Sequence, residues 1–284
     1  MAVAYLNGVW QAIHKAKISI LDRGFMFGDG VYEVIPVYNH KAFLLEQHLE
    51  RLSTSLDEIS IANPMTADQW AVLVLQAVEK GQEKNAVVYI QVTRGVAEKR
   101  EHLWPKNLSP TVLLTVSAAP GLARVYSNAS ITPYSMMTMD DFRWKNGHIK
   151  TISLLAAGLI KNEAVAKGVD DAILIRTGLV TESSSSNIFI VRNGAFVTPP
   201  KSSYILHGIT RDLVLMLARK SKILVEERDI QEAELFSASE VMVTSSGREL
   251  WPVGSINGSK IGDGAPGVIW KMLDKSFQEY KQTL

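Results

Sequence analysis

Residues 27–38 read Phe27-Gly28-Asp29-Gly30-Val31-Tyr32-Glu33-Val34-Ile35-Pro36-Val37-Tyr38, a glycine-rich turn followed by β-branched and aromatic residues. Such a run predicts a strand, with an edge position or a bulge at Pro36, which cannot donate a ladder hydrogen bond. An apolar stripe at helical spacing follows, made of Leu49, Leu52, Leu56 and Ile59. It predicts a helix that buries this stripe. A strand followed by a packed helix indicates the α+β class.

The same class extends to both sides of this stretch. Asn7-Gly8 lies between two β-type runs and predicts a two-residue hairpin. Thr66 and Gln69 form a capping-box pattern, so we expect a second helix that ends near Gly81. Residues 86–92 and 111–116 are rich in β-forming residues and predict two further strands.

The second half of the chain repeats the mixture of helix and strand signals. We expect a helix from about Thr151 to Lys167 and a strand over residues 172–175. Further turns are predicted at Thr177-Gly178, Asn193-Gly194 and Asn257-Gly258. Small residues and Pro-Gly at 118–121 suit a linker. With 284 residues, the chain is therefore expected to form a small N-terminal domain (1–118), a linker (119–124) and a larger C-terminal α+β domain (125–284).

Composition excludes several functional classes. The chain is 46% hydrophobic and 21% charged with a net charge of +1, so overall charge does not hold it to nucleic acid or an anionic membrane. It has no cysteine, which excludes disulfides, thiolate metal sites and a cysteine nucleophile. The histidines show no metal-type spacing, and no metal is expected. No secretory signal or membrane-spanning run is found, so we expect a cytoplasmic protein.

Two residues could carry covalent or electrostatic chemistry. Lys150 has apolar neighbours, and partial loss of hydration would favour the neutral amine that reacts with carbonyl groups. The alternative is a lysine that extends from a helix end into water. Glu182 precedes a run of serines between two β-type segments and could stay ionised beside a cationic ring nitrogen. The alternative is an ordinary surface glutamate in a solvated loop.

Three polar segments could bind anions. Gly208-Ile209-Thr210 precedes an apolar run, which places a turn at a helix N-terminus suited to a phosphate monoester. Val243-Thr244-Ser245-Ser246-Gly247 is a second hydroxyl-rich turn with the same capacity. Arg100 and His102 lie two residues apart and could grip a carboxylate together. Plain helix capping, an ordinary loop and a solvated charged loop are the respective alternatives.

Six ordered motifs together resemble the fold-type IV pyridoxal-phosphate enzymes, a group of D-amino-acid aminotransferases, branched-chain aminotransferases and aminodeoxychorismate lyases. The motifs are Asp22-Arg23-Gly24, Phe27 to Glu33, His48-Leu49-Glu50-Arg51-Leu52, Ile149-Lys150, Thr181-Glu182 to Phe189, and Gly208-Ile209-Thr210-Arg211. The resemblance covers almost the full chain. It implies a two-domain α+β fold of the branched-chain aminotransferase type, with pyridoxal 5′-phosphate in the interdomain cleft.

The resemblance also implies roles for single residues. Lys150 matches the lysine that holds the cofactor as a Schiff base, and Glu182 matches the carboxylate paired with the pyridine nitrogen. The implied phosphate cup consists of Arg51, Ile209, Thr210, Ser245 and Ser246. Leu206 matches the apolar residue against the ring face.

The substrate-binding residues implied by the resemblance are Tyr32, Val34, Arg100 and His102. Tyr32 with Arg100 and His102 resembles the carboxylate trap of D-amino-acid aminotransferases, in which the arginine and histidine come from the partner subunit of a homodimer. Val34 stands where branched-chain enzymes usually carry glycine. The loop from Arg94 to Arg100 is one residue longer than in the bacillary D-amino-acid enzymes.

The implied reaction is a ping-pong transfer of the amino group of a D-amino acid, such as D-alanine, to a 2-oxo acid, such as 2-oxoglutarate. Alternatives within the family are a branched-chain L-amino-acid transaminase, an (R)-amine transaminase and an aminodeoxychorismate lyase. A non-catalytic binding protein on the same scaffold is a further alternative, against which the presence of both Lys150 and Glu182 argues.

Overall fold

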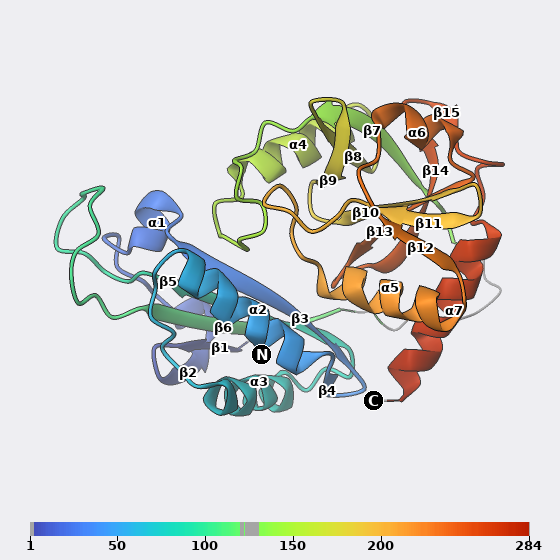
Figure 1. Ribbon diagram of the computed structural model, residues 1–284. Coiled ribbons are helices and arrows are strands. Elements are labelled where there is room, and N and C mark those ends of the chain that lie inside the picture. Colours follow the sequence, from blue (N-terminus) through green and yellow to red (C-terminus); the bar gives the residue numbers. More distant parts are fainter. Residues whose placement is uncertain (1–2, 120–121, 123–130, 284) are drawn as a thin grey trace. The chain divides into compact units, whose positions relative to one another are not determined.

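The computed structural model describes residues 3–119, 122 and 131–283 (Figure 1). The chain divides into two compact units, Met1–Ala123 with Ile149–Leu154, and Arg124–His148 with Leu155–Leu284. Each unit combines a sheet with helices, which confirms the α+β class. Of the predicted linker, 119–124, only Ala119 and Leu122 lie within the described residues.

The first unit is a sheet covered by two helices. Its strands run in the order β2-β1-β6-β5-β3-β4. The elements are β1 (Val3–Leu6), β2 (Val9–Ala12), the short helix α1 (Arg23–Phe27), β3 (Gly30–Tyr38), β4 (Lys41–Ala42), α2 (Leu45–Glu58), α3 (Ala67–Gly81), β5 (Ala86–Thr93) and β6 (Thr111–Ala118), with a 3-10 turn at Ile13–Lys15. Apolar residues of α2 and α3 form one buried cluster with those of β3, β5 and β6, so both helices cover the same face of the sheet.

Local sequence signals account for most of these elements. Asn7 and Gly8 both have positive φ, as a two-residue hairpin turn requires, and join β1 to β2. Thr66 and Gln69 form the capping box at the start of α3, which ends at Gly81 as predicted. The edge strand β4 pairs only with the last two residues of β3. The pairing of β3 with β5 on its other side runs through Pro36 without a bulge.

The segment around Lys150 differs from its prediction. The expected helix starts at Leu155 rather than near Thr151, because the preceding residues pair with the free edge of β3. Tyr32 N donates to the carbonyl of Lys150 at 3.0 Å, and Ile152 N donates to the carbonyl of Gly30 at 3.1 Å. Lys150 was predicted within the C-terminal domain, but its segment packs with the first unit.

The second unit is built on a nine-stranded sheet. Its order is β12-β11-β10-β13-β14-β7-β8-β9, with β15 paired to β14. The strands are β7 (Tyr134–Asp140), β8 (Asp171–Arg176), β9 (Leu179–Ser183), β10 (Asn187–Arg192), β11 (Ala195–Thr198), β12 (Leu224–Glu227), β13 (Glu240–Ser245), β14 (Glu249–Ile256) and β15 (Ser259–Lys260). The helices are α4 (Leu155–Ala166), α5 (Ile209–Lys220), α6 (Glu232–Ser237) and α7 (Val268–Gln282).

Packing in the second unit follows the apolar faces of these elements. Helices α5 and α7 contact each other and β13 and β14, whereas α4 packs on β7 and β8 (Figure 1). The three predicted turns at Thr177-Gly178, Asn193-Gly194 and Asn257-Gly258 have positive φ at both residues and join consecutive strands. Within the described part of the chain, none of the helices combines the length and apolar character needed to span a membrane.

Candidate functional site

Lys150 lies at the edge of β3 in the first unit. Its Nζ is 4.3 Å from the centroid of the Tyr32 ring, so the predicted cofactor lysine and one predicted substrate residue are in contact. The backbone N–H of Lys150 also donates to the hydroxyl of Ser55 in α2 at 3.3 Å. Pairing to β3 and this bond to α2 fix the backbone of Lys150, while its side chain is only partly buried. The backbone therefore provides a fixed base for a reactive amine.

A buried charge cluster lies on the helix-covered face of β3. The carboxylate of Glu33, fully buried, accepts from Arg51 Nε at 2.7 Å and from Arg51 Nη2 at 2.9 Å. His48 Nδ1 lies 2.8 Å from the same carboxylate. Burial alone would raise the pKa of Glu33, but Arg51 and His48 hold it well below its usual range. Arg51, predicted as a phosphate ligand, is thus oriented by a bidentate ion pair.

Burial also lowers the pKa of His48 below its ordinary value. Glu33 opposes this shift, whereas the charges of Arg51 and Lys150 add to it. His48 is therefore a neutral imidazole at neutral pH.

The loop that carries Arg100 and His102 is held in place by hydrogen bonds from Arg23 to its backbone. Arg23, which is buried, donates to the backbone carbonyl of Glu101 at 2.6 Å and to that of His102 at 3.3 Å, and pairs with Asp29 at 2.7 Å. The guanidinium of Arg100 lies 5.1 Å from the Phe27 ring centroid, and the His102 ring lies 5.6 Å from the same ring. Both side chains are exposed. The structure thus brings the two predicted carboxylate-binding residues together at one aromatic ring.

In the second unit, Glu182 is a buried carboxylate at the end of β9. Its Oε1 accepts from Arg143 Nη1 at 2.6 Å. Its Oε2 accepts from the backbone N–H of Leu206 at 3.0 Å and from Asn187 Nδ2 at 3.2 Å. The surface-loop alternative for Glu182 is therefore wrong. Burial raises the pKa of Glu182 above its ordinary value, and Arg143 and the Leu206 N–H oppose that rise.

Arg143 is itself locked in place by a second carboxylate. Its Nε and Nη2 donate to Asp141 at 2.9 and 3.0 Å, while Nη1 points to Glu182. Asp141 also pairs with Arg176 at 3.2 Å and accepts from the Thr181 hydroxyl at 2.9 Å. Such a network gives Glu182 one fixed orientation.

The start of α5 has the features of an anion site. Gly208 is its N-cap residue, and no side chain among the described residues caps the helix there. A Cβ atom at Gly208 would collide with the amide oxygen of Asn187, so the glycine permits close packing on β10. Ile209 and Thr210 begin the helix and are buried. Their backbone N–H groups belong to the first helical turn, where the helix dipole favours an anion.

The hydroxyl-rich turn of the second unit joins β13 to β14. Thr244 pairs with Asn187 on the neighbouring strand, and its buried hydroxyl oxygen has no hydrogen-bond partner among the described residues. Ser245 and Ser246 follow at the turn and are partly exposed. An unsatisfied buried hydroxyl next to hydroxyl-lined backbone fits a polar ligand group. Together with the free end of α5 and the buried Glu182, these residues fit a phosphate ester that carries a protonatable aromatic nitrogen.

The predicted site residues fall into two sets. The first unit holds Tyr32, Val34, Arg51, Arg100, His102 and Lys150, and the second holds Glu182, Leu206, Ile209, Thr210, Ser245 and Ser246. Tyr32 and Val34 share the face of β3 opposite to Glu33, as strand alternation requires. Leu206, predicted to contact a ring, contributes its backbone N–H to Glu182.

No individual role was predicted from the sequence for the residues that hold this set in place. They are Arg23, Asp29, Glu33, His48, Asp141, Arg143 and Asn187. One signal was available: Glu33 interrupts an apolar strand and alternates in phase with Val31 and Ile35, so it must be buried and needs a cationic partner. No comparable local signal marks Arg143, which is 39 residues away from Glu182 in the chain.

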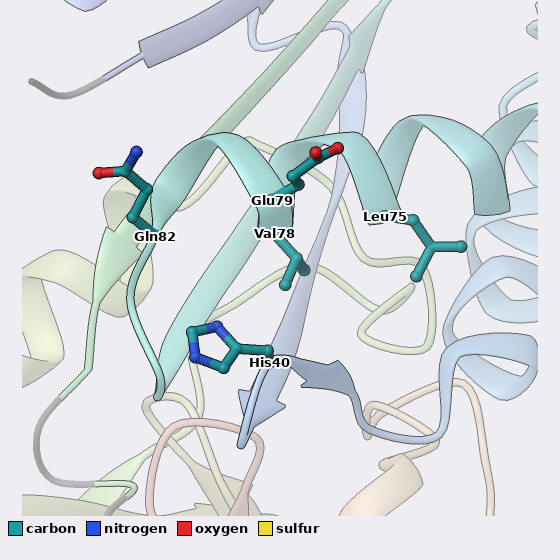
Figure 2. A pocket seen from close by; sticks show the side chains of 5 residues that line it. All are labelled: His40, Leu75, Val78, Glu79 and Gln82. Carbon is teal, nitrogen blue, oxygen red and sulfur yellow. The ribbon is translucent and has the colours of Figure 1, made fainter.

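A surface hollow of about 490 Å³ in the first unit is separate from these residues. Figure 2 shows its lining, formed by α3 with its C-terminal cap and by the turn between β3 and β4: His40, Leu75, Val78, Glu79 and Gln82. Only Val78 of these is buried, so no buried polar group is available to select a ligand there. Across residues 3–119, 122 and 131–283, no cluster of three metal-type side chains occurs.

Comparison with known sequences identifies related enzymes. Residues 30–256 match the family described as amino-transferase class IV. A D-alanine aminotransferase of Bacillus licheniformis is 37% identical over 272 residues, which cover 96% of this chain and 94% of that protein. A D-alanine aminotransferase of Staphylococcus aureus (strain MSSA476) is 35% identical over 280 residues, or 99% of this chain and 98% of that protein.

Solved structures share the fold. A branched-chain aminotransferase from Thermoproteus uzoniensis, solved with norvaline, has a TM-score of 0.88 at 24% identity and covers 100% of this chain and 96% of its own. A T.th. branched-chain aminotransferase complexed with N-(5′-phosphopyridoxyl)-L-glutamate has a TM-score of 0.88 at 24% identity, covering 99% of this chain and 94% of its own. These similarities confirm the fold-type IV architecture.

Proposed function

Because the chain belongs to the class IV aminotransferase family, whose enzymes use pyridoxal 5′-phosphate, we propose that it transfers the amino group of a D-amino acid to a 2-oxo acid. D-Alanine and 2-oxoglutarate are the proposed donor and acceptor. The observation that carries this proposal is the similarity, over nearly the whole chain, to D-alanine aminotransferases. When bound, the cofactor supplies an electron sink for the charge that forms at the substrate α-carbon.

Lys150 is the proposed attachment point and the proton carrier. Its Nζ would hold the cofactor through a covalent bond to the aldehyde carbon, and it would become free when a substrate amine takes its place. Once free, this amine would take the α-proton of the substrate and deliver it to the C4′ carbon of the cofactor. The Tyr32 ring beside Nζ limits where the amine can move. Because the amine approaches from one side, only the α-hydrogen that points toward it reacts.

Glu182 is proposed to hold the proton on the cofactor ring nitrogen. Its carboxylate is already oriented by Arg143, Asn187 and Leu206. A fixed negative group next to the ring nitrogen would keep that nitrogen protonated, which is the state in which the ring withdraws electrons best. Both Glu182 oxygens accept hydrogen bonds, so the carboxylate has little freedom to turn away.

The phosphate group is proposed to bind to Arg51, Ile209, Thr210, Ser245 and Ser246. The uncapped start of α5 and the buried Thr244 hydroxyl next to this turn support the assignment. Arg51 supplies positive charge, and the helix end supplies backbone donors.

Substrate selection is proposed to rest on Tyr32, Val34, Arg100 and His102. Arg100 and His102 would fix the substrate carboxylate, and exchanging the positions of carboxylate and side chain selects the D over the L enantiomer. We further propose a homodimer in which Arg100 and His102 serve the site of the partner subunit. Their exposure, with Leu103 75% and Trp104 49% exposed beside them, supports this. A cytoplasmic location stays a prediction.

The donor test uses purified holoenzyme with 2-oxoglutarate as acceptor. The proposal expects turnover with D-alanine and little with L-leucine or an (R)-arylamine. Preferred use of L-leucine or of the arylamine would replace the D-amino-acid assignment by one of the other transaminases. Pyruvate release from aminodeoxychorismate without any acceptor would indicate a lyase.

The dimer test mixes two defective variants. Lys150→Ala is expected to lack activity, and Arg100→Ala is expected to show a KM for D-alanine raised roughly tenfold or more. If Arg100 serves the partner subunit, subunit exchange between them restores sites with a normal KM. A mixture in which every active site keeps the raised KM would show that Arg100 acts within its own subunit or not at all.

A further inference from the structure

A buried polar cluster joins helix α7 to the turn between β13 and β14. Lys281 Nζ lies 2.6 Å from Glu249 Oε1, and Gln278 Nε2 donates to Glu249 Oε2 at 2.7 Å. Lys281 also donates to Gln278 Oε1 at 2.7 Å. Glu249, Gln278 and Lys281 are 2%, 1% and 7% exposed, so the cluster is shielded from water. Both oxygens of the Glu249 carboxylate are thereby tied to the last turns of α7.

Glu249 has an unusual backbone for its residue type. Its φ is 59°, in the left-handed region that favours glycine. It pairs with Ser245 across the turn, and Arg248 N donates to the Ser245 carbonyl at 3.3 Å. Glu249 therefore closes the turn that presents Ser245 and Ser246. A glycine would suit this backbone conformation, but it would lack the carboxylate through which Glu249 is bonded to α7.

Helix α7 is fixed at its other end to the same hairpin. Glu240, at the end of β13 away from the turn, accepts from the backbone N–H groups of Ile269 and Trp270, each at 2.8 Å. The Trp270 indole N–H donates to the Leu250 carbonyl at 3.3 Å. α7 is thus bonded to the start of β13 through Glu240 and to the start of β14 through Glu249 and Leu250.

We infer that Glu249, Gln278 and Lys281 act as positioning residues that set the affinity for the cofactor phosphate. The inference rests on the proposed phosphate role of Ser245 and Ser246. A turn that is already held in its binding conformation loses little freedom when the phosphate enters, so the affinity is higher than for a turn that must first be ordered. The bonds from Gln278 and Lys281 hold Glu249 in its left-handed backbone conformation, which would otherwise relax.

The test compares two ligands that differ only in the phosphate. Full-length apoprotein is titrated with pyridoxal 5′-phosphate and with pyridoxal, and release from the reconstituted holoenzyme is followed by absorbance. Lys281→Met is expected to weaken pyridoxal 5′-phosphate binding about tenfold and to leave pyridoxal binding unchanged. Lys281→Arg keeps the charge and is expected to restore most of the affinity.

Two further variants complete the experiment. Lys275→Met is the control, because it removes an exposed lysine of the same helix that lies 3.9 Å from Glu279. It is expected to change the affinity for neither ligand. The double variant Glu249→Gly, Lys281→Met suits the left-handed backbone and leaves neither charge of the buried pair behind, so it should fold even if Lys281→Met alone does not. It removes the anchor and is expected to lower the affinity for the phosphorylated ligand alone.

Folded Lys281→Met protein, or folded Glu249→Gly, Lys281→Met protein, that binds pyridoxal 5′-phosphate like the wild type would overturn the inference but leave the proposed function intact. An equal loss for both ligands would also overturn it, since the effect would not depend on the phosphate. A wild-type protein that binds neither ligand would instead refute the proposed function.

Discussion

Replacement of Arg143 by methionine tests whether Glu182 is held by the charge network around it. Methionine keeps much of the volume but removes the guanidinium. Glu182, 5% exposed, would keep only the N–H of Leu206 and the amide of Asn187. Asp141 would lose two bonds of 2.9 and 3.0 Å and keep Arg176 and Thr181. One buried carboxylate therefore loses its cationic partner outright.

Breaking a buried ion pair on one side typically costs about 3–5 kcal/mol, because the remaining charge stays desolvated. A domain is stable by about 5–15 kcal/mol, so the variant should lose a large share of its stability. At about 2–4 °C per kcal/mol, the melting temperature should fall by roughly 10 °C. Arg143→Met, Glu182→Gln should recover part of the loss, since the double change no longer buries an unpaired charge.

The assay is urea and thermal unfolding of the wild type, both variants and a control. Lys167→Met breaks an exposed i,i+4 pair with Glu163 in the same unit, and should cost less than about 0.5 kcal/mol. A loss below about 1 kcal/mol for Arg143→Met would refute the reasoning. So would a double variant that is less stable than Arg143→Met alone.

Three other substitutions and conditions give further checks. Gly208→Ala should destabilise by about 1–3 kcal/mol in thermal unfolding, because its Cβ would displace Asn187, whereas Gly158→Ala, with open space at that position, should be neutral or stabilising. An equal effect of the two changes would contradict this. The pKa values of His48 and Glu33 are both lowered in the folded state, so the unfolded chain binds more protons than the folded chain in acid. The free energy of unfolding should therefore fall as the pH drops below about 6.5, because of His48, and fall further below about 4.5, because of Glu33. Urea midpoints measured across this range should show a shallower decline below about pH 4.5 for Glu33→Gln, and a curve parallel to the wild type would argue against the assignment. Phe27→Ala removes the ring shared by Arg100 and His102 and should raise the KM for D-alanine with little change in cofactor absorbance; an unchanged KM would separate that ring from substrate binding.

Elements that depend on neighbours in sequence were predictable. The Asn7-Gly8 hairpin and the Thr66–Gln69 capping box follow from local backbone and side-chain chemistry. The predicted start of α4 was wrong because Lys150 and Ile152 hydrogen-bond to β3, a partner more than a hundred residues earlier in the chain. Helical pattern alone does not reveal that competing pairing.

In the candidate site, too, features that depend on neighbouring residues were predictable, and those that depend on distant residues were not. Lys150 and Glu182 were candidates by residue type and neighbours, but only the resemblance of six ordered motifs favoured their proposed roles over the alternatives. The groups that orient them were not predictable, since Arg143 meets Glu182 only after β7, β8 and β9 have assembled. Glu249 and Lys281 are 32 residues apart, and only the packing of α7 on β14 joins them.

The central claim is the covalent attachment of the cofactor to Lys150, and reductive trapping tests it most directly. The holoenzyme is treated with borohydride, digested and examined by mass spectrometry. We expect the peptide containing Lys150 to carry the mass of the reduced phosphopyridoxyl group, and the Lys150→Ala protein to carry none. Label on another lysine, or an unlabelled Lys150 peptide from a yellow, active enzyme, would contradict it.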